Sequence, residues 1–90
     1  MTKPRAVRLT DDALNEACGK LLRFLRKRKA LSVAEVSAQM GVSTTHLNDL
    51  ETGRYAARLA VLQKLCAMYG VTLVQFVTQL ERLMKEKNNE

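Results

Sequence analysis

The chain has 90 residues, enough for one domain, and a chain of this size buries only about 60% of the surface that it exposes when unfolded. A large catalytic cleft is therefore not expected. Hydrophobic residues make up 47% and charged residues 27% of the chain, as in globular proteins and unlike disordered ones. One proline, four glycines and 4% aromatic residues favour helices and argue against an all-β fold.

The net charge of +6 is concentrated at the start of the chain. Residues 1–30 hold nine basic and three acidic residues, and nine minus three already accounts for the whole +6. Such a basic block predicts a polyanionic partner, either nucleic acid or an anionic membrane surface. The alternative is a charged face that is only solvated.

Few residues are available for a metal site or for catalysis. Cys18 and Cys66 lack CxxC spacing and His46 is the single histidine, so no zinc ligand set can be assembled. No nucleophile, base and orienting group can be placed together, so we expect neither an enzyme nor a cofactor. There is no apolar signal region, and the longest apolar run, Leu65 to Tyr69, is too short to span a bilayer. We therefore expect a cytoplasmic protein with reduced thiols and no membrane partner.

The first elements in the chain are a basic arm over residues 1–9, with the single proline, and a helix that begins near Asp11. The hydroxyl and carboxylates at residues 10–12 suit the exposed amides and the positive dipole end of a helix start. Apolar residues then follow at the three- and four-residue spacing of a helix with one buried stripe, at Leu14, Cys18, Leu21, Leu22 and Leu25.

Two short helices are predicted next, over residues 33–40 and 44–51. Ser32 followed by Glu35 has the spacing of a capping box. Gly41 is expected to end the first helix in a left-handed conformation. Short helices bury little surface, so apolar residues must lock this pair together as a helix-turn-helix over residues 33–52. The locking positions are Val36, Met40, Val42, Leu47 and Leu50, with the small Ser37 at the crossing.

An apolar pattern predicts a fourth helix from Leu59 up to Gly70. Thr72 is expected to cap a last helix over residues 73–87, which completes one domain over residues 10–87. The apolar stripe of the last helix consists of Leu73, Phe76, Val77, Leu80, Leu83 and Met84.

Five stretches of the sequence form a pattern through their residues, their order and their spacing. They are Leu22–Arg26, Ala30–Ser32, Gly41–Leu47, Leu50–Gly53 and Leu65–Thr72. Together they resemble the Cro and phage-repressor type of helix-turn-helix domain, the xenobiotic-response-element family, over roughly residues 18–77. The resemblance implies an all-α, compact five-helix domain with extended first and last helices. It also implies that residues 44–51 enter the major groove of double-stranded DNA.

The resemblance assigns base-edge contacts to four residues, Thr44, Thr45, Asn48 and Asp49. Threonine offers a hydroxyl or a methyl, asparagine suits adenine, and aspartate accepts from cytosine. The alternative for Asp49 is repulsion of wrong sequences or pairing with a neighbouring arginine. Phosphate contacts are expected from Ser43, His46, Thr52, Arg54 and Arg58, although His46 is equally well explained as an exposed residue without a function.

The arm residues Lys3, Arg5 and Arg8 are expected to lie along DNA or in a minor groove, with a weakly contributing tail as the alternative. Arg26 and Glu51 match positions where the family has a buried, structural ion pair.

The sequence departs from the family pattern at three places, which comprise four residues. Val33 replaces a glutamine that bridges to phosphate, Ala30 replaces the glycine that ends the first helix, and Ala57–Arg58 replaces a proline and a serine.

One such domain covers half an operator, so two copies with half-sites one helical turn apart are expected. Leu80, Leu83 and Met84 extend past the family core and are the expected dimer contact. The alternative is packing inside the chain against the extended first helix, through Leu9, Ala13, Leu14 and Ala17.

The resulting prediction is a sequence-specific transcriptional regulator, most simply a dimeric repressor of phage or mobile-element type that binds an inverted-repeat operator. The alternative is an antitoxin-like module that binds a partner protein, a toxin or another regulator, and autoregulates. The exposed part of the last helix and the atypical Val33 favour that alternative.

Overall fold

A computed structural model describes the backbone of residues 3–88 and the side chains of residues 12–86. It contains five helices: α1 (Lys3–Arg28), α2 (Val33–Met40), α3 (Thr44–Glu51), α4 (Leu59–Met68) and α5 (Leu73–Asn88). Within residues 3–88 there is no strand. The expected all-α, five-helix fold with extended first and last helices is confirmed.

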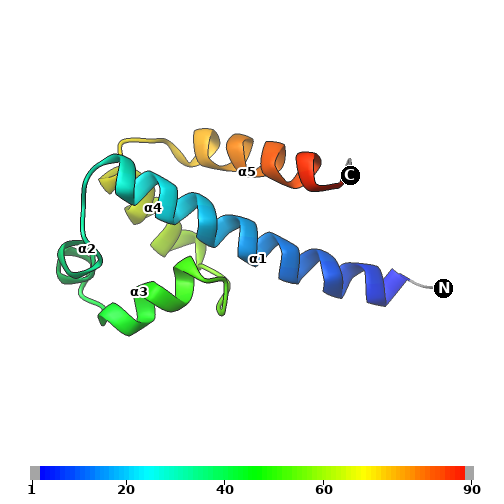
Figure 1. The fold of residues 1–90 in the computed structure, drawn as a ribbon, viewed down its shortest axis with the longest axis horizontal. Coiled ribbons are helices and arrows are strands. Elements are labelled where there is room, and N and C mark those ends of the chain that lie inside the picture. The colour runs from blue at the N-terminus through cyan, green and yellow to red at the C-terminus, as the bar shows by residue number, and fades with distance from the viewer. Residues whose placement is uncertain (1–2, 89–90) are drawn as a thin grey trace.

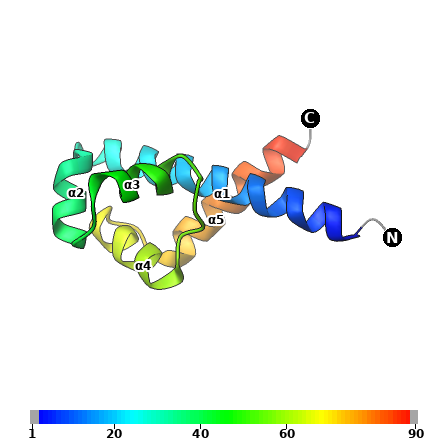
Figure 2. The same cartoon turned by 90° about the horizontal axis from the view of Figure 1, so that it is seen from below.

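The long helix α1 forms the axis of the molecule. Figure 1 shows α5 along one side of α1 and α3 along the other, with α2 at the end of the domain away from the two termini. Contacts between α1 and α3, α1 and α5, α2 and α3, and α4 and α5 hold these elements together. In Figure 2, α1 and α5 cross, and their free ends diverge beyond the core.

The start of α1 differs from the prediction. The expectation of an arm over residues 1–9 and of a helix start near Asp11 is wrong, since α1 already begins at Lys3. Pro4 is compatible with this start, because the first amides of a helix have no intrahelical acceptor and proline fits the first turn. Arg5 and Arg8 lie on the same helix, but these arm side chains fall outside the described ones.

The two short helices begin and end where the sequence predicts. The Glu35 amide donates to Ser32 Oγ at 3.0 Å, and the Ser32 amide donates to Glu35 Oε1 at 2.8 Å, which completes the capping box. Gly41 ends α2 with φ of 72°. A second capping box, in which Thr72 and Gln75 exchange the same two hydrogen bonds, starts α5.

The core lies where α1, α3, α4 and α5 meet. Of the expected locking residues, Val36, Leu47 and Leu50 are buried, while Met40 and Val42 are half-buried. The side chains of the core are Ala17, Leu21, Leu22, Leu25, Val36, Leu47, Leu50, Leu62, Leu65, Cys66, Tyr69, Phe76 and Leu80.

Leu80 is a core residue, with 9% of its surface exposed. The expectation that it is exposed beyond the core is wrong, because it belongs to the same core cluster as Ala17 of the extended α1. Leu83 and Met84 are half-buried and pack against this cluster. Packing inside the chain, the alternative considered from the sequence, therefore accounts for most of this stripe.

Among residues 3–88, no single helix is long and apolar enough to cross a bilayer. The helices α4 and α5 reach that length and composition only when joined, and they are bent by 101° at their break.

Candidate nucleic-acid interface

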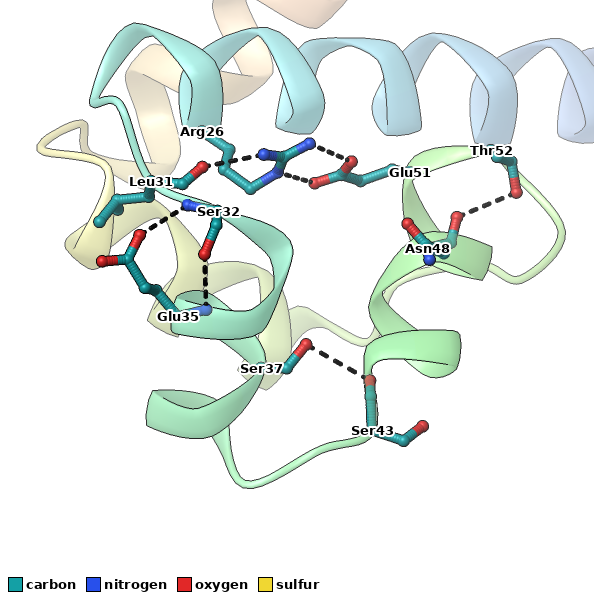
Figure 3. A network of polar contacts seen from close by, with 9 residues as sticks. All are labelled: Arg26, Leu31, Ser32, Glu35, Ser37, Ser43, Asn48, Glu51 and Thr52. Atoms are coloured by element: carbon teal, nitrogen blue, oxygen red, sulfur yellow. Dashed lines mark hydrogen bonds and ion pairs between the residues drawn. The ribbon is translucent and has the colours of Figure 1, made fainter.

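The orientation of α3 is fixed by its contacts with α2 and α1. Leu47 and Leu50 of α3 and Val36 of α2 belong to one buried cluster. Ser37 is also buried at this crossing, and its hydroxyl donates a long hydrogen bond of 3.5 Å to the carbonyl of Ser43 (Figure 3). The inner face of α3 is thus held by apolar packing and its outer face is left to solvent.

That outer face carries the residues expected to read base edges. Thr44, Thr45 and Asn48 are exposed, and Asp49 is half-buried beside them. The structure therefore brings the four predicted base-contacting residues onto one solvent-facing part of α3.

The start of α3 presents hydrogen-bond donors to solvent. Ser43 Oγ accepts from the His46 amide at 3.0 Å, and the first bond to a backbone carbonyl runs from the Leu47 amide to the Ser43 oxygen at 3.2 Å. The amides of Thr44 and Thr45 precede that bond and have no acceptor in the helix. Such amides, at the positive end of the helix dipole, favour an anion.

Asp49 faces an arginine. Its Oδ1 lies 3.8 Å from Arg54 Nε, and the Arg54 amide donates to the Asp49 carbonyl at 2.9 Å. Of the roles considered from the sequence, pairing with a neighbouring arginine is the one visible in this structure. The Arg54 side chain remains largely exposed.

Thr52 is less suited to phosphate than expected. Its Oγ1 lies 3.0 Å from the Asn48 carbonyl, to which it donates (Figure 3), and 3.2 Å from that of Asp49. The hydroxyl proton is thus already donated to a carbonyl at the end of α3. Only the lone pairs of Oγ1 remain, and these cannot donate a hydrogen bond to a phosphate oxygen.

An aromatic contact in the loop after α3 was missed by the sequence reasoning. The rings of His46 and Tyr55 stack with centroids 6.1 Å apart and planes 28° from parallel. Together with Arg58 they line a hollow beneath the loop. In the sequence, Tyr55 is a single tyrosine in a short polar loop. Nothing in its spacing indicates which residue its ring contacts.

The ion pair expected between Arg26 and Glu51 is present and buried (Figure 3). The hydrogen bond from Arg26 to Glu51 raises the pKa of the guanidinium above its ordinary value, so Arg26 stays charged in spite of burial.

The remaining predicted residues lie elsewhere. Leu80, Leu83 and Met84 belong to α5, on the opposite side of α1 from α3 (Figure 1). Among the described residues, no group of three or more His, Cys, Asp or Glu side chains is placed to hold a metal ion.

Comparison with known proteins places this geometry in a family. A family model described as a helix-turn-helix domain matches residues 17–84. The HTH-type transcriptional regulator DdrOP3 of Deinococcus deserti is 33% identical over 60 residues, which are 67% of this chain and 46% of the regulator. The ImmF control region 10 kDa protein of Bacillus phage phi105 is 33% identical over 55 residues, 61% of each chain. The chain thus spans about half of the first relative and less than two thirds of the second.

A solved structure has the same fold. The clp gene regulator ClgR from C. glutamicum superimposes with a TM-score of 0.73 and 28% sequence identity, over 79% of this chain and 92% of that one. DdrOP3 and ClgR are described as regulators, which agrees with the expectation from the sequence that the chain is not an enzyme. The matched model spans most of the chain, including α2 and α3, so the chain belongs to the helix-turn-helix domain family.

Proposed function

We propose that the chain is a sequence-specific DNA-binding transcriptional regulator whose α3 reads base edges in the major groove. The observation that supports this most is the division of α3 into two faces. Leu47 and Leu50 are locked in the core, whereas Thr44, Thr45 and Asn48 point to solvent from a helix that cannot rotate. A rigidly held polar face of this size suits a major groove.

Phosphate contacts flank that face in this proposal. The hydroxyl of Ser43 and the amides of Thr44 and Thr45 serve one strand, and the exposed Arg54 and Arg58 serve the backbone beyond the far end of α3. His46 lies between these groups. Thr52 is left out, because its hydroxyl proton is already used within the chain.

The regulator acts as a dimer on an inverted repeat and represses by blocking access to a promoter. It resides with the DNA in the cytoplasm.

The proposed dimer contact lies further out on the surface than the residues predicted from the sequence, because Leu80 is in the core. The most exposed apolar side chain of α5 is Val74, at 75%, and Val77 follows it one turn later. Leu14 of α1 and Val77 both line a groove along α5 that includes Met84. These are the residues that a second copy would cover.

The experiment that tests the function is selection of bound duplexes from a random DNA pool, followed by titration of the selected duplex and a scrambled one at several salt concentrations. We expect an inverted repeat with half-sites about 10 base pairs apart, bound at least ~10³-fold more tightly than scrambled DNA. Weak binding of every sequence, falling steeply with salt, would contradict sequence-specific recognition.

The dimer contact is tested by light scattering. Val74→Lys combined with Val77→Lys should give a folded monomer, because two charges would be buried in the contact. Leu59→Lys, at an exposed apolar residue of α4, is the matched control and should leave the mass unchanged. If the protein with both substitutions were still a dimer, the dimer contact would lie elsewhere on the surface.

A further inference from the structure

A groove between α1 and α5 has no part in the proposed DNA contact. Its lining includes Ala17, Leu21 and Phe24 of α1 and Gln79 and Leu83 of α5. A second hollow shares Leu21, Phe24 and Gln79 and continues to Arg28 and the turn at Gly70. Together they form one trough, here called the α1/α5 groove, whose apolar floor lies in the part lined by Ala17, Leu21, Phe24 and Leu83.

Phe24 is the main apolar wall of the α1/α5 groove. It is 58% exposed, although its ring is large and apolar, and the Arg28 guanidinium carbon lies 5.7 Å from the ring centroid. Exposure of an aromatic ring to water is less favourable than its burial against an apolar surface. A partner that covered the Phe24 ring would gain this hydrophobic free energy on binding.

The α1 side of the groove is cationic. Lys20 and Arg28 line it from α1, both are exposed, and neither forms an ion pair with a carboxylate of the residues whose side chains are described. The ion pairs found among those residues are Arg26 with Glu51 and Arg54 with Asp49. One acidic residue, Glu86, also lines the groove. Two lining cations against one carboxylate leave the groove with a net positive charge.

The position of the groove separates it from the DNA-reading helix. Gly19 and Arg26 of α1 face α3, whereas Ala17, Leu21 and Phe24 face α5. Figure 1 shows α5 and α3 on opposite sides of α1. An occupant of the groove and a duplex on α3 would therefore not compete for the same surface.

Charge decides which occupant fits. A second copy would bring the exposed end of α5, where the charges of Glu81, Arg82, Lys85 and Glu86 cancel and offer no net counter-charge, or its own cationic α1 face. Like charges facing each other oppose such a contact. Nucleic acid would satisfy the cations but not the apolar floor or Phe24. An apolar stripe flanked by carboxylates satisfies both.

We propose that the α1/α5 groove binds an acidic amphipathic helix of a partner protein. The apolar stripe of that helix packs against Leu21, Phe24 and Leu83, and its carboxylates face Lys20 and Arg28. This surface is additional to the DNA-reading face, and it adds a route by which a second protein reaches the regulator.

The test uses a synthetic helical peptide of about 18 residues, five turns long, with leucine and phenylalanine along one stripe and glutamate on both flanks. A matched peptide carries lysine in place of each glutamate. Binding is measured by nuclear magnetic resonance titration of the full chain, which also locates the contact. The variants are Phe24→Ala and Arg28→Glu, with Leu59→Ala and Lys64→Glu on α4 as controls of matching exposure and charge.

We expect the acidic peptide to shift the signals of Leu21, Phe24 and Leu83 and to bind at least about tenfold more tightly than the lysine peptide. Phe24→Ala and Arg28→Glu should each weaken it at least about fivefold, and the α4 controls less than twofold. Equal binding of both peptides, or no shift at about 1 mM acidic peptide, would overturn the proposal. So would a loss of affinity of Arg28→Glu for a random duplex as large as its loss for the peptide, since the cations would then belong to a DNA surface. None of these outcomes depends on whether a specific operator exists.

Discussion

Arg26 of α1 holds both carboxylate oxygens of Glu51, the last residue of α3, with Nε 2.7 Å from Oε2 and Nη2 3.0 Å from Oε1. The third nitrogen, Nη1, donates to the Leu31 carbonyl at 2.9 Å, just before α2. One guanidinium therefore ties α1 to the end of α3 and to the segment just before α2. This side chain adds to the apolar packing of Leu47 and Leu50 that orients α3.

The first prediction concerns this ion pair. Glu51→Ala should lower the free energy of unfolding by about 3–5 kcal/mol, because Arg26 would remain buried without its partner. Urea unfolding measures the change. Arg26→Met combined with Glu51→Leu should regain most of the loss, since no buried charge then remains. A Glu51→Ala protein with an unchanged unfolding midpoint would show that the pair is not needed for stability.

The second prediction concerns the crossing of α1 and α3. A Cβ atom on Gly19 would lie 2.5 Å from the Glu51 carbonyl oxygen and 2.6 Å from that of Leu50. Both are backbone atoms, so the two helices would have to separate. Gly19→Ala should destabilise the domain by about 1–3 kcal/mol, against the gain that alanine normally brings to a helix. Lys20→Ala, next along α1 and exposed, is the control and should change thermal stability little.

The third prediction concerns the turn after α1. Ala30 has φ of 58°, whereas the other described residues with positive φ are glycines. A left-handed alanine costs about 1–2 kcal/mol, and glycine loses about 0.5–1 kcal/mol more backbone entropy on folding. Ala30→Gly should therefore stabilise the domain by about 0.5–1 kcal/mol in thermal or urea unfolding. A destabilised Ala30→Gly variant would show that the strain is relieved in another way.

Local signals explain what the sequence could predict. The bounds of α2 and α3 follow from Ser32 with Glu35, from Gly41 and from Ser43, each of which acts within four residues. The start of α1 was misplaced because a basic stretch containing proline fits both an arm and a first helical turn.

Contacts between distant segments explain what the sequence could not predict. Gly19 is required because α3 passes over it, and Leu80 is buried in a cluster that also contains Ala17 of α1. The stacking of His46 on Tyr55 depends on the path of the loop after α3. None of these relationships is encoded by spacing along one segment.

The fourth prediction concerns alkaline pH. Burial raises the pKa of Tyr69 from 10.0 to about 12, and the charge of Glu51 acts in the same direction. The folded state therefore favours the neutral phenol, whose contribution to stability is fully present below pH 10 and is lost as the pH rises toward 12. Urea unfolding at several pH values measures this loss.

Tyr69→Phe is the control for that titration. It should reduce the alkaline slope, and the slope that remains belongs partly to Cys18, whose pKa burial raises to about 11. At neutral pH this variant should be as stable as the parent or up to about 1 kcal/mol more stable, because the Tyr69 hydroxyl is buried without a hydrogen-bond partner among the described residues. An unchanged alkaline slope would show that Tyr69 does not titrate with unfolding.

The fifth prediction separates reading from holding on the proposed DNA face. Asn48 is exposed on α3 among the residues that we propose face base edges, whereas Arg54 lies beyond the end of α3 and pairs with Asp49 at 3.8 Å. Asn48→Ala should cost about 1–3 kcal/mol on the selected duplex and relax the preference at one base pair, without changing the salt dependence. Arg54→Ala should weaken all duplexes alike and reduce the slope of log affinity against log salt by about 1. Titrations of the selected duplex and single-base variants at four salt concentrations distinguish the two patterns.

A different result for Arg54→Ala would change this assignment. If the variant relaxed the preference at one base pair, the pair of Asp49 and Arg54 would be reading a base edge. The recognition surface would then include the side of α3 on which Asp49 lies, in addition to Thr44, Thr45 and Asn48.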